Sequence, residues 1–484
     1  MEEQQAAQQG SWIEPIKQYF LDFGVLKDNP MEFWAIQIIN FLDMAAYFSM
    51  ISIITLFLTD NIGWNDVNAG YIVTAFTMFV TISLFFSGFI TDSLGIKASL
   101  ILAMIIQGVT RFGVLMCGLL PDLPGRQWLV ILSLVLTAPG MAMTQTVFQA
   151  ANKRFSTTRS RSASFNIWYL VMNVGAIIGG LMIDWVRLVL KIDNSYIFAF
   201  ATGAAVLSIL TAIVMIRRET QAGKPETSPE TSNQDGEEAG RKEEKKGAWQ
   251  IFREVTAESA FWRFIVLMAA LLGVRAIFLY MYLLMPKFWV RVIGPDVEMG
   301  LLQTINPVLI VIGLVLFIPI ANKFNVFKML VFGAIISSFS LFVLILPYNW
   351  FSGDVATAFF WMSVIMLVVL SMGEVIWSPK LQEYTAAIAP RGQEGSYLGM
   401  SMMPWFFAKL LVSAMSGHML AKWVPEGTGE NLKSGHLTFW QSPSALWLIL
   451  FLWALSGPIL ALVFKGWLTK GANLDPPAKK EKGE

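Results

Sequence analysis

The feature of this 484-residue sequence that most limits its fold is a succession of apolar segments, each long enough to cross a membrane. A membrane-spanning helix needs about 20 largely apolar residues. Twelve segments meet this requirement: 33–58, 68–90, 97–120, 127–150, 163–189, 195–216, 260–290, 299–321, 326–347, 357–380, 393–421 and 440–466. Only 14% of the residues are charged, against roughly 25% in soluble domains. The sequence therefore predicts an all-α integral membrane protein with twelve transmembrane helices.

One strongly polar segment interrupts this succession after the sixth span. Residues 217–258 are rich in Glu, Lys, Gly, Ser and Thr, and such a segment cannot pack a core. We expect it to be a mostly disordered linker between two six-helix bundles. The expected parts are a leader with an amphipathic helix (1–30), an N-terminal bundle (31–216), the linker (217–258), a C-terminal bundle (259–467) and a tail (468–484). A poorly ordered leader is the alternative for the first part.

Lysine and arginine gather in alternate loops, and this sets the expected orientation. The rich loops, the linker and the tail carry Lys153, Arg154, Arg159, Arg161, Arg217, Arg218, Lys323, Lys328, Lys465, Lys470, Lys479 and Lys480. The positive-inside rule then places both termini and the linker in the cytoplasm. Residues 1–10 lack the signature of a cleaved signal, so the first span is expected to direct insertion. We expect a multi-pass protein of the plasma membrane, or of the inner membrane in a Gram-negative cell.

A carboxylate stands inside the tenth apolar segment, in the stretch SMGEVIWSP at 371–379. Such a group costs about 2.5 kcal/mol or more on insertion scales, so it usually faces a bundle interior or a watery cavity and marks a transport path. The pair Ser378 and Pro379 frees backbone carbonyls, which only a packed or wet environment can satisfy. The sequence therefore predicts that Glu374 lies at a central cavity.

Further polar side chains are expected inside the spans. The other charged ones are Asp43, Arg111, Arg275 and Lys409. Buried charges persist when they are paired, so Asp43 is expected to pair with a cation of its own bundle and Glu374 with Arg275 or Lys409. The residues alone do not choose between these partners.

Two amides suit recognition of a polar solute, because an amide both donates and accepts hydrogen bonds. Asn173 lies in an apolar segment with Gly175, Gly179 and Gly180, which allow close helix approach. Asn306 precedes Pro307, which is expected to break its helix at mid-span. The alternative role for both amides is hydrogen bonding between helices.

Several functions find no support in the sequence. No nucleotide-binding loop, metal-ligand cluster or nucleophile triad is present, so neither a cofactor nor a metal is expected. The single cysteine, Cys117, excludes an internal disulfide, and a net charge of +1 without a basic stripe gives no reason to expect nucleic acid. A membrane enzyme would need a catalytic constellation, and a receptor or scaffold would not need Glu374 and Asp43.

Two six-helix halves joined by a cytoplasmic linker are the layout of major facilitator transporters. The loop after the second span, GFITDSLGIK at 88–97, resembles the loop motif of that superfamily, Gly-x-x-x-Asp-Arg-x-Gly-Arg-Arg, with Ser93 at the first arginine. This resemblance implies a gating or structural role for Asp92.

Three further blocks are similar to proton-dependent oligopeptide transporters. They are SASFNIWYLVMNVGA at 162–176, LQTINPVLI at 302–310, and GEVIWSP at 373–379 with the following loop to Pro390. The resemblance implies that Asn173, Asn306 and Glu374 contact substrate. It also implies a surrounding site that includes Tyr47, Gln303, Trp377, Ser378 and Trp405, with Glu374 and Asp43 as the candidates for proton coupling.

The sequence departs from that family at its cations. The first-helix pattern of the family, Glu-x-x-Glu-Arg-Phe-x-Tyr-Tyr-Gly, corresponds to NFLDMAAYFS at 40–49, where Asn40 and Met44 replace a glutamate and the arginine. The fourth-helix lysine of the family falls at about Met143, and its seventh-helix glutamate near Arg275. A neutral methionine cannot hold a carboxylate, so ordinary di- and tripeptides are not the expected substrates.

Together these features predict a secondary active transporter that moves a small organic, peptide-like solute across the lipid bilayer by alternating access. A carboxylic acid in a low-dielectric cavity can change protonation near neutral pH, so H⁺ is the expected coupling ion. The alternative is an exporter or uniporter of a non-peptide amphipathic solute without proton coupling. We expect a monomer and no enzymatic activity.

Overall fold

The computed structural model describes residues 23–157, 159–217, 259–321, 324–388 and 403–470, and these are helical without strands. The helices are α3 (Met31–Leu56), α4 (Asp66–Leu94), α5 (Ile96–Leu119), α6 (Arg126–Arg154), α7 (Arg161–Asp184), α8 (Tyr196–Met215), α10 (Ser259–Ala270), α11 (Leu272–Leu283), α12 (Met285–Val292), α13 (Met299–Ala321), α14 (Val326–Ser340), α15 (Val355–Ile388), α17 (Met403–Trp423), α18 (Thr428–Lys433), α19 (Pro443–Val463) and α20 (Lys465–Leu468). Two π-helical turns extend α3 and α7, namely η2 (Phe57–Asn61) and η3 (Trp185–Val189).

The expected all-α membrane fold is confirmed. Within the described residues, nine helices are long and apolar enough to cross a membrane, and the bent pair α10 and α11 adds a tenth. A shorter apolar helix covers Met299–Gly313, and each of the twelve expected segments contains at least one helix. The count of twelve and the cytoplasmic termini stay predictions. The leader helix, the linker and most of the tail lie outside the described residues.

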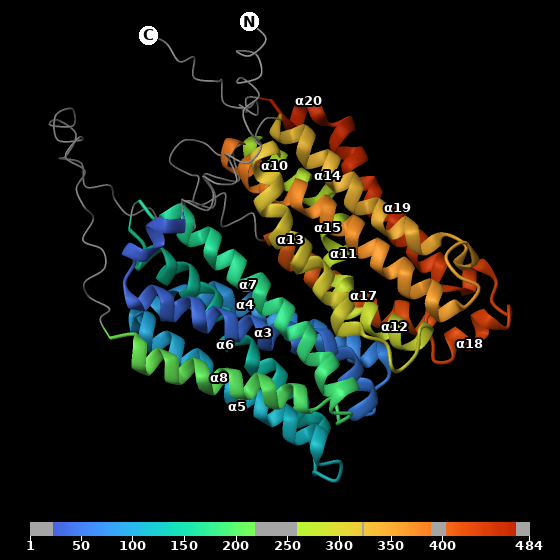
Figure 1. Ribbon diagram of the computed structural model, residues 1–484, viewed down its shortest axis with the longest axis horizontal. Coiled ribbons are helices and arrows are strands. Elements are labelled where there is room, and N and C mark those ends of the chain that lie inside the picture. Colours follow the sequence, from blue (N-terminus) through green and yellow to red (C-terminus); the bar gives the residue numbers. More distant parts are fainter. Residues whose placement is uncertain (1–22, 158, 218–258, 322–323, 389–402, 471–484) are drawn as a thin grey trace, which may run out of the picture.

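The helices form two bundles that follow the chain order, α3 to α8 in one and α10 to α19 in the other (Figure 1). The bundles approach each other where α12 lies beside α3, and they diverge toward the end where α8 stops and α10 begins (Figure 1). We call the first of these the contact end and the second the linker end.

Glycine pairs allow the bundles to touch at the contact end. A Cβ atom on Gly70 of α4 would lie 3.1 Å from the backbone N of Gly417 on α17. A Cβ atom on Gly180 of α7 would lie 2.8 Å from the carbonyl oxygen of Gly300 on α13. Since a side chain at any of these positions would push backbones apart, close packing between the bundles requires glycine here.

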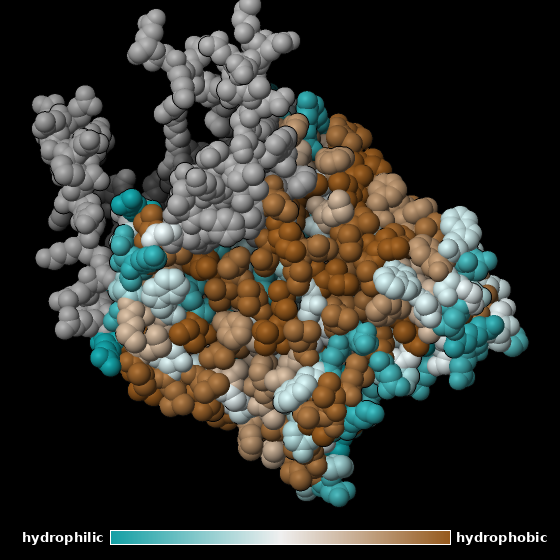
Figure 2. Space-filling view, in the orientation of Figure 1, coloured by the Kyte–Doolittle hydropathy of each residue, from teal (hydrophilic) through white to brown (hydrophobic). Residues whose placement is uncertain are grey.

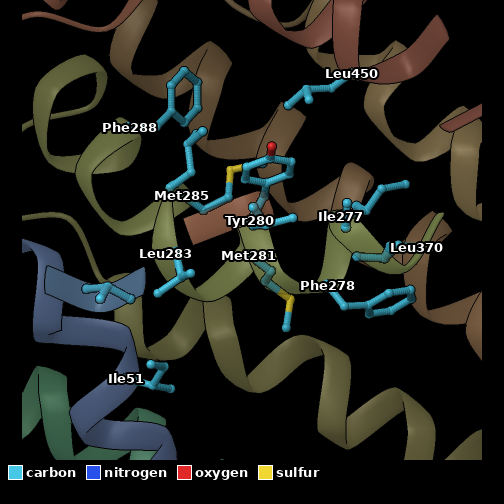
Figure 3. Packing of buried hydrophobic residues seen from close by; sticks show 14 of the residues in the cluster. Ile51, Ile277, Phe278, Tyr280, Met281, Leu283, Met285, Phe288, Leu370 and Leu450 are labelled. Atoms are coloured by element: carbon cyan, nitrogen blue, oxygen red, sulfur yellow. The ribbon is translucent and has the colours of Figure 1, made fainter. Parts of the chain in front are cut away.

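Apolar packing continues across the contact end. Ile51 of α3 belongs to the same buried cluster as Met281 and Leu283 of α11, and Figure 3 shows these side chains on the facing sides of their helices. The Thr55 hydroxyl donates across the same contact to the carbonyl of Leu283 (3.3 Å). Burial of this cluster therefore stabilises the contact between the bundles as well as each bundle.

The outer surface is apolar around the middle of both bundles. Figure 2 shows a continuous hydrophobic region over the helices, and hydrophilic residues along the contact end. Large side chains such as Phe89, Trp128 and Trp350 are more than two-thirds exposed, at 76%, 76% and 71%. Such a surface is stable only against lipid, in agreement with an integral membrane protein.

One expectation about the helices is wrong. Helix α13 continues through Pro307, so the proline does not break it at mid-span. Helix α15 likewise continues through Pro379 to Ile388. The breaks occur instead between α10 and α11, which are bent by 47°, and at the start of α12, where Pro286 stands in the first turn. Neighbouring helices in a packed bundle can compensate for the hydrogen bond that a proline removes.

Candidate transport site

The centre of the candidate site is Glu374 on α15. Its Oε2 atom accepts a hydrogen bond from Asn306 Nδ2 of α13 (2.8 Å), and the same amide donates to Ser371 Oγ (3.1 Å). The preceding residue, Gly373, packs on Gly333 of α14, where an added Cβ would lie 2.8 Å from the Gly373 carbonyl. Because successive helical residues are about 100° apart, Glu374 is turned from α14 toward α13. The structure thus brings together two of the expected substrate contacts.

Two tyrosines, one from each bundle, interact electrostatically with this carboxylate, and a third tyrosine interacts with one of them. Tyr169 of α7 and Tyr282 of α11 interact with the charge of Glu374, and Tyr282 also interacts with Tyr47 of α3. Glu374 and the three tyrosines are all partly exposed. Partly exposed polar side chains from four helices therefore face one another between the bundles, which is the arrangement expected for a site that a solute can enter. Tyr169 and Tyr282 were missed by the sequence analysis, since a tyrosine in an apolar segment carries no special signal.

Two of the expected amides lie beside this group. Asn173 is 7% exposed, and its Nδ2 donates to the carbonyl of Tyr169 one turn earlier (2.9 Å). Gln303 lies one turn before Asn306 and is 4% exposed, and its Nε2 has no hydrogen-bond partner among the residues that the structure describes. A buried donor without a partner is costly, so Gln303 is available to a ligand or a water molecule.

The expected cation partner of Glu374 is not found within the described residues, where its carboxylate accepts from Asn306 instead. The guanidinium of Arg275 lies over the ring of Trp377, 5.9 Å from the centroid. The indole Nε1 of Trp377 donates to Ser337 Oγ of α14 (3.1 Å), so this buried side chain packs inside the C-terminal bundle rather than among the tyrosines. Its expected contact with substrate stays a prediction.

The other residues of the expected site are placed less fully. Ser378 is half-buried, one turn after Glu374. Lys409 is half-buried on α17, where its carbonyl accepts from Ser413 Oγ (2.7 Å). Trp405 and Asp92 lie on the helices α17 and α4, and their side chains lie outside the described part of the structure.

A second buried polar cluster lies inside the N-terminal bundle. Asp43 Oδ1 and Arg111 Nη2 form an ion pair at 3.1 Å, with side chains 3% and 1% exposed. Arg111 also donates to Gln107 Oε1 one turn earlier and to the carbonyl of Ala201 (3.4 Å). Asp43 thus has a cation of its own bundle as its partner, and both side chains are buried.

An ion cluster at the contact end was missed by the sequence analysis. Asp66, at the start of α4, accepts from Arg291 Nη1 and Nη2 of α12 (2.8 and 3.1 Å) and pairs with Lys287 one turn before Arg291. Arg291 also donates to the carbonyl of Val424 at the end of α17 (2.8 Å). Asp66 follows Asn65, an ordinary helix N-cap, so only the packing of the two bundles reveals its partners.

Comparisons with known proteins agree with this architecture. The family model of the Major Facilitator Superfamily matches residues 34–413. A search of the curated proteins found no significant match. Fold, apolar surface and central polar site together define a multi-pass integral membrane protein of the transporter class. The chain belongs to the Major Facilitator Superfamily.

Similar solved structures come from the POT family. The peptide transporter POT in complex with sulfate is 15% identical with a TM-score of 0.69, over 92% of this chain and 96% of its own. A POT family transporter in complex with 5-aminolevulinic acid is 15% identical with a TM-score of 0.68, over 91% and 97%. The POT family transporter PepTSo is 15% identical with a TM-score of 0.67, over 91% and 99%. At this identity the likeness concerns the fold.

Proposed function

We propose that this protein is a secondary active transporter that couples the movement of a small, peptide-like organic solute to H⁺ by alternating access. One observation carries the proposal. Glu374 is a partly exposed carboxylate at mid-helix that faces polar side chains of both bundles and has an amide, not a cation, as its hydrogen-bond partner. A carboxylate without a compensating charge in such a site is free to exchange a proton.

The test is uptake into proteoliposomes. A proton gradient, imposed with the inside alkaline, should drive accumulation of the substrate, and a protonophore should abolish it. Uptake that equilibrates without accumulation would instead support the alternative, an exporter or uniporter without proton coupling.

The substrate class follows from the charges of the site. One similar structure is that of a peptide transporter, and another is a POT family transporter in complex with 5-aminolevulinic acid. Peptides and 5-aminolevulinic acid both carry an amine. Here Glu374 offers an anionic partner for an amine, while Met44 and Met143 stand where the related family has cations for a carboxylate. We infer that the substrate carries an amine or another cation and that its carboxyl end is absent or masked.

Free dialanine should therefore bind about tenfold more weakly than dialanine amide, because a desolvated carboxylate without a charged donor keeps much of its desolvation cost. Binding of both ligands to the purified protein, measured calorimetrically, tests this. Asn306→Ala should also weaken binding of dialanine amide, whereas Asn431→Ala, at an exposed position of α18, should weaken binding of neither ligand. Tight binding of free dialanine that depends on Asn173 and Asn306 would identify an ordinary peptide transporter.

The ion cluster of Asp66, Lys287 and Arg291 joins the bundles at the contact end, which the positive-inside orientation places outside. We infer that it holds the outer side closed. Asp66→Asn removes the only carboxylate within 3.5 Å of the two cations among the described residues, and leaves the buried Lys287 without its partner. The closed state should be destabilised by about 2 kcal/mol. This is less than the cost of breaking a fully buried ion pair, because Arg291 is partly exposed.

A cysteine at Thr55, in the contact between α3 and α11, reports this change in a Cys117→Ser background. External maleimide should label this cysteine faster in Asp66→Asn than in the protein with Asp66 intact. The control Asp122→Asn, which changes an exposed carboxylate of another loop, should leave the labelling rate unchanged. An unchanged rate in Asp66→Asn would show that the cluster does not hold the bundles together.

A further inference from the structure

A groove of about 560 Å³ lies at the seam between the two bundles, beside the end of α7 and the start of α13. Its wall is apolar and includes Ile178, Leu181, Trp185 and Leu301, while Asp184 and Glu298 stand at one end. It is separate from the site around Glu374. We propose that this groove binds a membrane lipid with a primary ammonium head group, whose acyl chain lies along α7 and whose ammonium pairs with Glu298.

The wall of the groove has the form of an acyl-chain site. Ile178, Leu181 and Trp185 are spaced at three and four residues, so they form one stripe along α7. Leu181 and Trp185 are 44% and 49% exposed, which leaves much of each side chain to be covered by something apolar. From Ile178 to Trp185 the stripe is roughly 10 Å long, enough to cover the part of an acyl chain nearest the head group. Trp185 also marks the depth at which a bilayer meets its head groups.

The polar end of the groove carries an excess of negative charge. The carboxylate of Asp184 accepts hydrogen bonds from two backbone N–H groups at the start of α13, at 2.8 and 2.7 Å. Arg187 is the nearby cation, and its guanidinium interacts electrostatically with three carboxylates, Asp60, Asp184 and Asp296. The charge of Glu298 in turn interacts with that of Asp184. The Arg187 guanidinium also donates hydrogen bonds to two backbone carbonyls of the loop before α13 (2.8 and 3.3 Å).

The carboxylate of Glu298 is accessible to a ligand. Glu298 is exposed, and its carboxylate accepts no hydrogen bond from the described residues. A primary ammonium can both neutralise this carboxylate and donate hydrogen bonds to it. A choline head group cannot donate, and an anionic head group is repelled by the surrounding carboxylates. The charges therefore select phosphatidylethanolamine over phosphatidylcholine and phosphatidylglycerol.

Binding at this seam has a consequence for the transport cycle, and this consequence, unlike the binding itself, rests on the proposed function. Most of the wall belongs to the N-terminal bundle, but Glu298 and Leu301 belong to the C-terminal one. A lipid that touches both bundles where they meet stabilises the conformation in which the contact end is closed.

Native mass spectrometry of the purified full chain tests the binding without any transport measurement. The protein is incubated with phosphatidylethanolamine, phosphatidylcholine or phosphatidylglycerol of identical acyl chains, and retained lipid is counted. We expect the ethanolamine lipid to be retained most. Glu298→Gln should reduce its retention about threefold, the effect of losing one partly screened charge pair, and Asp122→Asn should leave it unchanged.

Leu181→Trp tests the wall, because the larger ring fills the groove and should reduce retention of the ethanolamine lipid with the carboxylates intact. Equal retention of the three lipids, or retention that Glu298→Gln leaves unaltered, would overturn the proposal. Both substitutions change exposed side chains outside the packed core, so they leave the fold intact. Loss of proton-driven uptake in any of these variants would bear on the proposed transport function, whereas lipid retention alone tests this site.

Discussion

Glu374→Gln should abolish proton-driven accumulation of substrate while the protein remains folded. Glutamine keeps the shape of the side chain and can still accept a hydrogen bond from Asn306, but it cannot take up and release a proton. Counterflow exchange across proteoliposomes with no gradient should continue, because it needs only binding and the movement of the bundles. The expected result is therefore loss of coupling with retained exchange, measured on the same preparation.

The control is Glu430→Gln, which changes an exposed glutamate of α18. It should leave accumulation unchanged. If Glu374→Gln still concentrates substrate against a gradient, Glu374 is not the coupling group. Asp43 would then be the next candidate.

Arg111→Met should have the largest effect on stability. It leaves the Asp43 carboxylate buried without its ion-pair partner, and breaking a buried pair in this way costs about 3–5 kcal/mol. The midpoint of thermal unfolding in detergent should fall sharply. Arg161→Met, which changes an exposed arginine at the start of α7, should leave the midpoint within error of the original protein.

The double substitution Asp43→Leu with Arg111→Met should recover most of this loss, because replacing both partners by apolar side chains removes the uncompensated charge. A double variant as unstable as Arg111→Met alone would mean that the pair itself does not explain the effect. The recovered protein also separates the two candidate coupling groups. If it still accumulates substrate, proton coupling does not require Asp43.

The polar residues show where sequence reasoning was sufficient. Glu374 and Asn306 stand out because a polar side chain in a hydrocarbon segment has few stable environments, and the structure places them in contact. The partners of a given charge were not predictable. From the sequence, Arg275 and Lys409 were equally reasonable partners for Glu374. Only the packing of α15 against α13 and α14 decides that the partner is the amide of Asn306.

The sequence by itself determined that this chain is a membrane protein built from helices in two halves. The reason is local: in lipid each backbone group must be satisfied within its own segment, so a run of about 20 apolar residues already specifies a helix. The relation between the halves was decided by the tertiary structure alone. Asp66 meets Lys287 and Arg291 more than 200 residues away, and Asp184 binds the start of α13, because glycine pairs bring the two bundles together. Those contacts depend on the relative position of distant helices, which no local pattern of residues records.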